Sequence, residues 1–491
     1  MKILILNPPS ENTLPEFPDL HGESYIDTED FGYFPPLGAL YVLSYLEKHS
    51  KGHELFFKDC VAERIKQKDL AGVINQIQPD VVGITSFTIA LLDVCYAART
   101  IRKIVPRAHL CLGGHHPIAF PFQAAKLQEF DSIVVGEGEQ AFLELVTALE
   151  QKRDITQIRG VYTSESIEKW RGSTFHDKVF FSHVMVPPAY MDDIDSLPIP
   201  NRAFIRNIDY KSIVGVTNKL ATIITSRGCP YKCTFCDVPY KQYRKRSISK
   251  VVDEVETCLQ MGYKEIHFYD DLFNITPERV IDFCDEIEKR KLKFPWDFRG
   301  RVNTVTRESL ARAKQAGCRL ISFGVETGSD AGLKSLKKGI TIRRIKEVFQ
   351  WCRELTIKTI ADFMIGLPFE KSKDDVRKNL DFLLELDPDY PQIAILCLYP
   401  NTEIFQQAVD KGLVNPTKWE EFSLNPSKDF HIDHWEEFLS IQELVDLQKE
   451  GYKKYYLRPS YVVRNILSTR SFYEFKAKAR GALKLLGFHC G

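Results

Sequence analysis

The stretch LATIITSRGCPYKCTFCDVP, Leu220–Pro239, joins a strand-like run to three closely spaced cysteines. The run at its start is short and apolar, as a buried parallel strand should be. Cys229, Cys233 and Cys236 follow it directly, so we expect them in the loop at its carboxyl end. Zinc normally takes four protein ligands, and the nearest downstream histidine, His267, lies beyond a predicted helix. A [4Fe–4S] cluster on three thiolates would instead leave one iron open for a small molecule.

Strand-like and helix-like segments alternate on both sides of this stretch. Downstream, about six strand–helix repeats favour a partial barrel with its chemistry at the carboxyl ends of the strands. Upstream, the same alternation predicts a doubly wound, Rossmann-like parallel sheet. The fold class is therefore α/β. The expected parts are a doubly wound domain at 1–150, a linker over the surface at 151–208, a partial (βα)6 barrel at 209–425 and a helical, basic region at 426–491.

The composition is that of a soluble globular protein. The chain has 491 residues, of which 44% are hydrophobic, and it carries 66 basic and 66 acidic residues. Zero net charge gives no reason to expect nucleic-acid binding. No apolar run approaches the roughly 20 residues that cross a bilayer. The nine cysteines outside the cluster are scattered and no export signal is apparent, so we expect buried thiols in a reducing, cytoplasmic compartment.

The C-x3-C-x2-C pattern, with the aromatic Phe235 before its last cysteine, resembles the cluster-binding loop of the radical S-adenosylmethionine (SAM) superfamily. The resemblance implies that Cys229, Cys233 and Cys236 are the catalytic centre and hold a [4Fe–4S] cluster whose open iron binds SAM. Reductive cleavage of SAM would give a 5′-deoxyadenosyl radical that takes hydrogen from a substrate. A structural zinc knuckle is the alternative.

Further strand ends fall where that superfamily contacts SAM. They carry the motifs FYDD at 268–271, RGRVN at 299–303, SFGVETGS at 322–329 and MIGLPFE at 364–370. The resemblance implies SAM contacts at Asp270, Arg301, Glu326 and Gly366. Helix capping for Asp270, a surface position for Arg301 and a plain turn for Gly366 are the alternatives.

The first domain, with NPP, PDVVGITSFT, GGHHP and DSIVVGEGE in chain order, resembles the cobalamin-binding domain of many radical SAM enzymes. The glycines fall at predicted strand ends, where they permit close approach of a bulky ligand. The D-x-H-x-x-G motif of other cobalamin proteins is missing, because Asp59 has no histidine two residues on. We expect His115 and His116 to line the cleft rather than bind cobalt. The implied cobalamin contacts are Thr85, Ser86, Gly113, Gly114, Gly136 and Gly138.

Together the resemblances imply an enzyme that uses a [4Fe–4S] cluster, SAM and cobalamin to methylate an unactivated carbon of a small molecule. Relatives suggest a hydrophobic substrate such as a lipid or a tetrapyrrole, and an electron donor such as flavodoxin or ferredoxin. One alternative is a radical cyclase or oxidative rearrangement without methyl transfer, as in the anaerobic cyclase of bacteriochlorophyll synthesis. A cobalamin-binding sensor without activity is another, but the cysteine triplet argues against it.

The end of the chain is basic and aromatic. Between Lys453 and Lys484, nine Lys or Arg residues accompany a single acid, Glu474. Such a segment can lie on an anionic membrane, which would give peripheral membrane contact. The alternative is a helix packed on the barrel with a solvated basic face.

Overall fold

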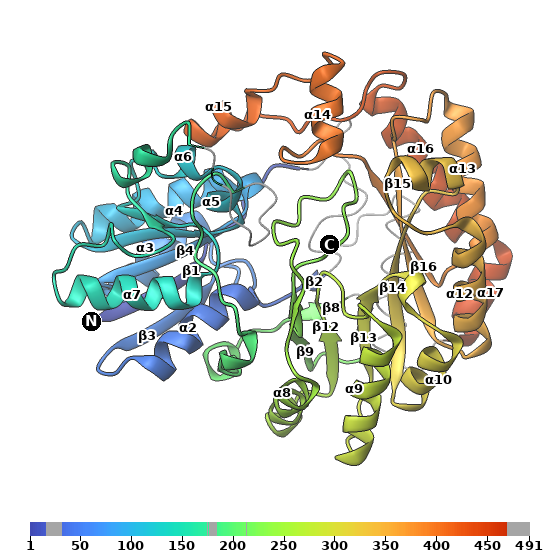
Figure 1. Ribbon diagram of the computed structural model, residues 1–491, viewed down its shortest axis with the longest axis horizontal. Coiled ribbons are helices and arrows are strands. Elements are labelled where there is room, and N and C mark those ends of the chain that lie inside the picture. The colour runs from blue at the N-terminus through green and yellow to red at the C-terminus, as the bar shows by residue number, and fades with distance from the viewer. Residues whose placement is uncertain (16–31, 174, 176–183, 213, 469–491) are drawn as a thin grey trace.

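Two parallel sheets organise the computed structural model of this chain (Figure 1). The structure describes residues 1–15, 32–173, 175, 184–212 and 214–468. The predicted α/β class is confirmed: a doubly wound sheet comes first, a six-stranded parallel sheet follows, and helices end the described chain. The domain boundaries themselves stay predictions.

The first sheet has the strand order β3-β1-β4-β5-β6-β7. Its strands are β1 (Lys2–Asn7), β3 (Glu54–Asp59), β4 (Val81–Ser86), β5 (His109–Gly114), β6 (Ser132–Val134) and the antiparallel β7 (Val161–Tyr162). Helices α2 and α7 pack together, as do α3 and α4, and they flank the sheet (Figure 1). Chain order reverses between β1 and β4, so a ligand crevice is expected outside their carboxyl ends. The helices are α2 (Leu37–His49), α3 (Gln67–Ile77), α4 (Leu91–Ile104), α5 (His115–Ala119), α6 (Pro121–Ala124) and α7 (Gly138–Glu150).

The second sheet has the order β16-β15-β14-β13-β12-β9, and each neighbouring pair is parallel. It is a partial barrel, because β9 and β16 are both edges of the described sheet. Its strands are β9 (Leu220–Ile223), β12 (Glu265–Phe268), β13 (Trp296–Gly300), β14 (Cys318–Glu326), β15 (Lys358–Ile365) and β16 (Tyr390–Ile395). The helices between them are α8 (Ile248–Gln260), α9 (Pro277–Lys289), α10 (Arg307–Gln315), α11 (Asp330–Ser335), α12 (Ile342–Glu354) and α13 (Lys373–Leu386).

Ser and Thr side chains start most helices of the barrel. Thr276, for example, accepts a hydrogen bond from the Arg279 backbone ahead of Pro277, so this predicted helix start is as the sequence indicates. Such caps satisfy backbone N–H groups that have no partner within the helix. The same cap is made by Thr306, Ser329, Thr341 and Ser372. Because each cap follows a strand end or a turn, the caps help to fix where each βα unit changes direction.

The linker lies over the surface only in part. Val186, Ala189 and Met191 are buried, and the backbone of Ala189 forms a bridge with Gly136 of the first domain. Arg202 is also buried, and its guanidinium pairs with Glu254 of α8 at 2.6 Å. The surface prediction is wrong for 184–191, where most apolar side chains are buried in the hydrophobic clusters of the molecule, while 151–154 is exposed. The linker therefore fixes the sheets relative to each other.

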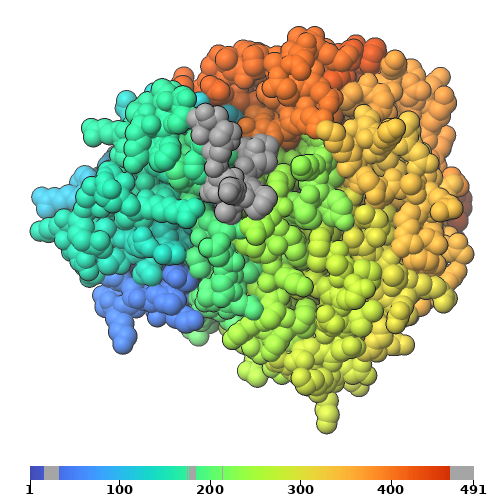
Figure 2. Space-filling view, viewed as in Figure 1, coloured from blue at the N-terminus to red at the C-terminus, as the bar shows by residue number. Residues whose placement is uncertain are grey.

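A second connection between the sheets comes from the C-terminal helices. Trp419 and Phe422 of α15 (Lys418–Leu424) share a hydrophobic cluster with Phe120 and Phe122 of the first domain. Together with α14 (Glu403–Asp410), this segment arches over the molecule from the barrel to the first sheet (Figures 1 and 2). Helices α16 (Ile441–Tyr456) and α17 (Pro459–Ser468) pack at the β16 side. No helix among the described residues combines the length and apolar character that a bilayer span requires.

Candidate active site

A short hairpin closes the cysteine loop directly after β9. Its strands are β10 (Ser226–Arg227) and β11 (Arg244–Lys245), which pair antiparallel. Gly228 begins the loop with a φ of 84°, and a side chain there would collide with the backbone of Tyr240 and Gln242. The Cys229 N–H donates to the Tyr240 carbonyl at 2.9 Å. The three cysteines are therefore held at the carboxyl end of β9, as the sequence indicates.

The three thiols fit an iron–sulfur cluster better than a single metal ion. All three are free and half-buried. Among the described residues, a trio of ligand atoms all within 4.8 Å of one another occurs elsewhere and not at these cysteines. Burial raises the pKa of the Cys236 thiol to about 11, so ionisation there needs a compensating cation, which iron would supply. The Nη1 of Arg301, 3.7 Å from the Cys233 sulfur, adds positive charge.

The compact trio consists of Glu265, His267 and Asp297 in the barrel sheet. His267 lies 3.3 Å from each carboxylate. Arg319 also contacts both acids, at 2.8 Å from Asp297. Because Arg319 pairs with both acids and His267 contacts both as well, the trio is explained as a buried ion-pair network without a metal ion. His267 belongs to that network, which removes it as a zinc ligand for the cysteines.

Asp270 lies beneath the cysteine loop. Its buried carboxylate accepts hydrogen bonds from the Thr225 N–H and hydroxyl, both at 2.5 Å, and from the Ser226 N–H at 3.1 Å. Burial raises the pKa of Asp270 to about 6. Asp271 is the exposed acid of the FYDD motif and accepts a hydrogen bond from the Gly228 backbone. The SAM contact at Asp270 stays a prediction, and Asp271 presents the more accessible carboxylate.

Arg301 and Glu326 lie beside the cysteine loop, as the strand ends predict. The Arg301 guanidinium lies 3.7 Å from the centre of the Tyr231 ring. Glu326 pairs with Lys338 at 2.5 Å, and both side chains are nine-tenths buried. Lys338 in turn lies 5.7 Å from the Phe235 ring, between two cluster cysteines. The structure thus gathers one acid and two cations around the loop, while their contact with SAM stays a prediction.

Sequence reasoning missed Lys338, because it lies in a Lys-Lys-Gly turn after α11 and not at a strand end. Glu326 itself has a φ of 68°, in a region that costs a non-glycine residue about 1–3 kcal/mol. Such strain at the end of a strand is common where a side chain is aimed at a functional site. Gly366 also has a positive φ, 76°, and a side chain there would come within 2.9 Å of Leu444 in α16. Its SAM contact stays a prediction.

Four of the predicted cobalamin residues meet at one place. Thr85 pairs with Gly113 and Ser86 with Gly114 at the carboxyl ends of β4 and β5. The Ser86 hydroxyl donates to the Gly113 carbonyl at 2.8 Å, and any side chain at Gly114 would lie 2.6 Å from the Ser86 backbone. This place adjoins the point between β1 and β4 where the strand order reverses and a ligand crevice is expected.

Aromatic side chains border the same strand ends. Phe87 is 63% exposed and stacks with His115 at 6.0 Å. An exposed large aromatic side chain next to glycine backbone suits a flat, bulky ligand. Phe87 and the neighbouring Gly113 and Gly114 therefore fit cobalamin. His116 is buried, burial lowers its pKa to about 3, and its Nε2 has no hydrogen-bond partner among the described residues.

Gly136 and Gly138 follow β6 and pack closely against other parts of the chain. A side chain at Gly136 would collide with the backbone of Ala189, and one at Gly138 would lie 2.9 Å from Val42 of α2. Close packing accounts for both glycines, and their contact with cobalamin stays a prediction. His115, by contrast, reaches across to the barrel: its Nε2 lies 3.6 Å from the carboxylate of Asp237, next to Cys236. The crevice and the cysteine loop therefore face each other.

Two family models match this chain, the B12 binding domain over residues 27–146 and the radical SAM superfamily over residues 223–383. The chain belongs to the cobalamin-binding radical SAM enzymes. Its cofactors are a [4Fe–4S] cluster, SAM and cobalamin, and the predictions of family and cofactors are confirmed.

Individual relatives of these radical SAM enzymes match over most of their length. The chain is 28% identical to the uncharacterized methyltransferase PH0819 of Pyrococcus horikoshii, over 99% of this chain and 98% of that protein. It is 26% identical to the anaerobic magnesium-protoporphyrin IX monomethyl ester cyclase of Rubrivivax gelatinosus, over 88% and 75%. It shares its fold with TsrM, a radical SAM methyltransferase from Kitasatospora setae, with a TM-score of 0.69 at 17% identity over 98% and 99%.

Replacing Cys233 with alanine should abolish cluster loading, because three thiolates are the fewest that can hold the cluster with one iron open. Iron content and the visible absorption of the anaerobically reconstituted protein measure this. Cys397→Ala, which removes another half-buried thiol, is the matched control and should load normally. Full iron content with SAM cleavage in Cys233→Ala would refute the cluster assignment.

Proposed function

We propose that this chain is a cobalamin-dependent radical SAM methyltransferase that methylates an unactivated carbon of a small molecule. The observation that carries the proposal is the approach of His115, at the cobalamin crevice, to Asp237 in the cysteine loop. When bound, the cofactors supply a hydrogen-abstracting radical and a transferable methyl group. The name of the P. horikoshii relative, which matches nearly end to end, supports methyl transfer.

The chain's own residues bind and shield the reacting groups. The cysteines hold the cluster, while Arg301 and the Lys338–Glu326 pair place charges beside it. Phe235 and Tyr240 of the cysteine loop pack against a hydrophobic cluster that contains residues of both the first domain and the barrel, which would keep water from the space between the cofactors. Holding two reaction partners in place and excluding water are the protein's main contributions in such chemistry.

The second candidate is a radical cyclase or oxidative rearrangement without methyl transfer, which the 26% identity to the R. gelatinosus cyclase favours. Methyl transfer consumes two SAM molecules, giving S-adenosylhomocysteine from one and 5′-deoxyadenosine with methionine from the other. A cyclase needs no methyl donor and forms no S-adenosylhomocysteine.

Methyl-labelled SAM separates the two candidates. We expect the reduced holoenzyme, incubated with a small-molecule extract of its host cell, to form labelled product with comparable amounts of S-adenosylhomocysteine and 5′-deoxyadenosine. Mass spectrometry measures all three, and the Cys233→Ala protein is the blank. Product that forms with 5′-deoxyadenosine but carries no label would favour the cyclase.

Arg299 supports a substrate with an acidic group on a hydrophobic skeleton, such as a tetrapyrrole carboxylate or a lipid phosphate. Along β13, Phe298 is buried and Arg299 is exposed, and successive side chains of a strand point to opposite faces of its sheet. Its guanidinium lies 4.6 Å from the Tyr269 ring and donates to the Tyr269 hydroxyl at 3.3 Å. No carboxylate in the described part of the chain lies within 4.0 Å of it, although its charge opposes the rise in pKa of three neighbouring acids, Asp271, Asp297 and Asp362. We therefore propose that Arg299 binds the substrate's acidic group.

Arg299→Gln should lower formation of the labelled product about tenfold or more, because a hydrogen bond between charged partners is worth about 1.5–3 kcal/mol. Cleavage of SAM in the absence of substrate should stay unchanged, since that reaction does not need the acidic group. Arg307→Gln, which breaks an exposed ion pair with Glu354, is the control. A fall in SAM affinity as large as the fall in product would show that Arg299 serves SAM instead.

We further propose a cytoplasmic enzyme reduced by a flavodoxin or ferredoxin. The support for this location is that, Cys397 aside, the ten other described cysteines are free, the state expected in a reducing compartment. The flavodoxin or ferredoxin follows from the need of the cluster for a low-potential electron, which small redox proteins commonly supply.

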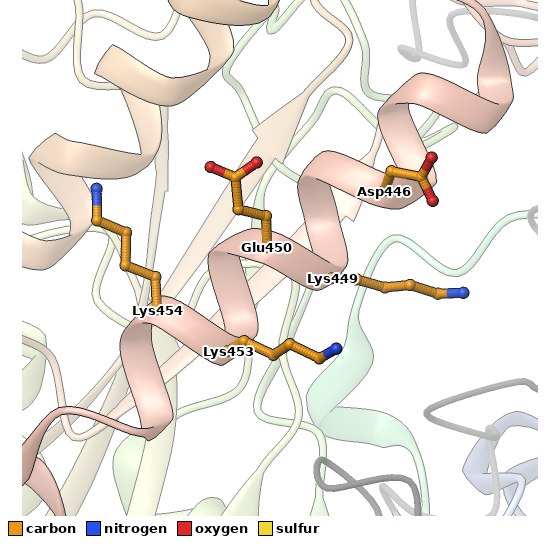
Figure 3. Close-up of a pocket in the computed structure, with 5 residues that line it drawn as sticks. All are labelled: Asp446, Lys449, Glu450, Lys453 and Lys454. Carbon is orange, nitrogen blue, oxygen red and sulfur yellow. The ribbon is translucent and has the colours of Figure 1, made fainter.

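The described part of the basic tail packs on the barrel. Tyr455 is buried, and Lys454 pairs with Asp381 at 2.6 Å. Arg458 and Arg464 both pair with Asp387. Figure 3 shows lysines and acids side by side on the outer face of α16, a mixed surface with little net positive charge. Peripheral membrane contact through the tail therefore depends on residues 469–491, which lie outside the described residues.

Truncation after Ser468 tests the membrane proposal without disturbing the packed helices. We expect the full chain to sediment with vesicles that contain phosphatidylglycerol, and the truncated chain to stay in solution, since the removed residues carry an excess of basic over acidic side chains. Vesicles of phosphatidylcholine alone are the control. Failure of the full chain to sediment would end the membrane proposal.

A further inference from the structure

Two arginines at the base of the cysteine loop bind one glutamate of the first domain. Arg227 and Arg244 face each other across the β10–β11 hairpin. Arg244 donates to both carboxylate oxygens of Glu137, at 2.8 and 2.9 Å. Arg227 reaches the same carboxylate at 2.9 Å. We call these three residues the clasp, and its two-pronged Arg–carboxylate geometry fixes orientation as well as distance.

Further contacts surround the clasp. Arg227 also pairs with Glu139, at the start of α7. The Met191 N–H of the linker donates to Glu137 at 2.7 Å, and the Met191 carbonyl accepts from Arg244. The linker thus contacts both sides of the clasp.

The clasp is buried, so its charged groups must be paired in good geometry to offset the loss of hydration. Side-chain exposure is 3% for Glu137 and 6% for Arg244, while Arg227 is 15% exposed. Burial opposes ionisation of Glu137, but the two guanidinium groups hold its pKa below the usual value. Buried ion pairs add little net stability compared with apolar packing, yet a broken one leaves an uncompensated charge. Geometry rather than stability is therefore the better explanation for such a pair.

The clasp lies between the cysteine loop and the sheet of the first domain. Arg227 lies two residues before Cys229, and Glu137 follows β6 in the sheet that carries the cobalamin crevice. The loop does not need Glu137 in order to close, because β10–β11 pairing and the Cys229–Tyr240 hydrogen bond are local. Gly136 and Gly138, on either side of Glu137, meet the linker and α2 closely. The closely packed GEGE segment, residues 136–139, thus holds Glu137 in place against the base of the cysteine loop.

We propose that Glu137 is a positioning residue that, through Arg227 and Arg244, holds the cysteine loop at one distance and orientation from the cobalamin crevice. This rests on the proposed function in that both cofactors must act on one substrate molecule. The role needs no contact between Glu137 and either cofactor. The clasp keeps the distance between the cluster site and the cobalamin site constant. If this distance varied, a radical could form too far from the methyl donor to react with it.

The test uses the holoenzyme of Glu137→Gln, which keeps the shape of the side chain and removes its charge. The readout is the magnetic coupling between the reduced cluster and cob(II)alamin, measured by pulsed electron paramagnetic resonance. We expect one narrow distance in the wild-type enzyme and a broadened distribution in the variant, with iron and cobalamin contents unchanged. Glu403→Gln, which breaks an exposed ion pair with Lys337, should leave the distance narrow.

A second readout tests the consequence for turnover. Labelled product per 5′-deoxyadenosine should fall about tenfold in Glu137→Gln while total SAM cleavage persists, and Glu137→Asp should recover part of the coupling. The distance measurement needs no substrate, so it stands even if methyl transfer fails. A narrow, unshifted distance in Glu137→Gln overturns the proposal.

If Glu137→Gln does not fold, Arg244→Lys replaces it, since lysine keeps the charge and loses the two-pronged geometry. A broadened distance in a fully loaded Arg244→Lys enzyme supports the proposal. Loss of the cluster in both variants overturns it, because the clasp would then be a folding element and not a spacer.

Discussion

Parallel strands carry all their carboxyl ends to one edge of a sheet, and in this chain two such edges face each other. The first holds Ser86 and Gly114 at a crevice, and the second holds the cysteine loop. His115 and Asp237 approach each other across the gap. Everything proposed about the chemistry depends on this arrangement, because two cofactors can act on one molecule only if their sites open toward the same space. The sheets alone do not ensure it, since their relative placement is set by other parts of the chain.

Those other parts are the linker, α15 and the clasp at Glu137. The linker buries Val186 and Met191 in the hydrophobic clusters of the molecule, and α15 joins the barrel to the aromatic residues near α6. Apolar packing of this kind sets an approximate arrangement, while the two-pronged Arg244–Glu137 pair sets an orientation. These two roles follow from the physics of the contacts. Apolar contacts are non-directional and contribute free energy of folding, whereas hydrogen bonds between charged groups are directional and fix the relative orientation of the parts they join.

The sequence revealed the local features well. Short apolar runs ending in glycines or cysteines predicted both sheets, and Cys229, Cys233 and Cys236 lie where the preceding strand puts them. Contacts between residues far apart in the chain could not be predicted from the sequence. The Glu137–Arg244 pair spans 107 positions, and no pattern in either segment names its partner. The linker was misjudged because its apolar residues alternate with prolines and follow no period. At FYDD, a shift of one residue decides whether Asp270 or Asp271 turns to solvent, which is finer than strand prediction can resolve.

The central claim is that one chain holds both cofactors facing a common substrate space. Anaerobic reconstitution with iron, sulfide and cobalamin, followed by Mössbauer, optical and paramagnetic spectra of the same sample, tests it most directly. We expect a single [4Fe–4S] cluster and a single cobalamin per chain, and a cluster spectrum that changes when SAM is added. Cobalamin binding without a cluster, or a cluster spectrum that does not respond to SAM, would show that the two cofactors do not act together in this chain.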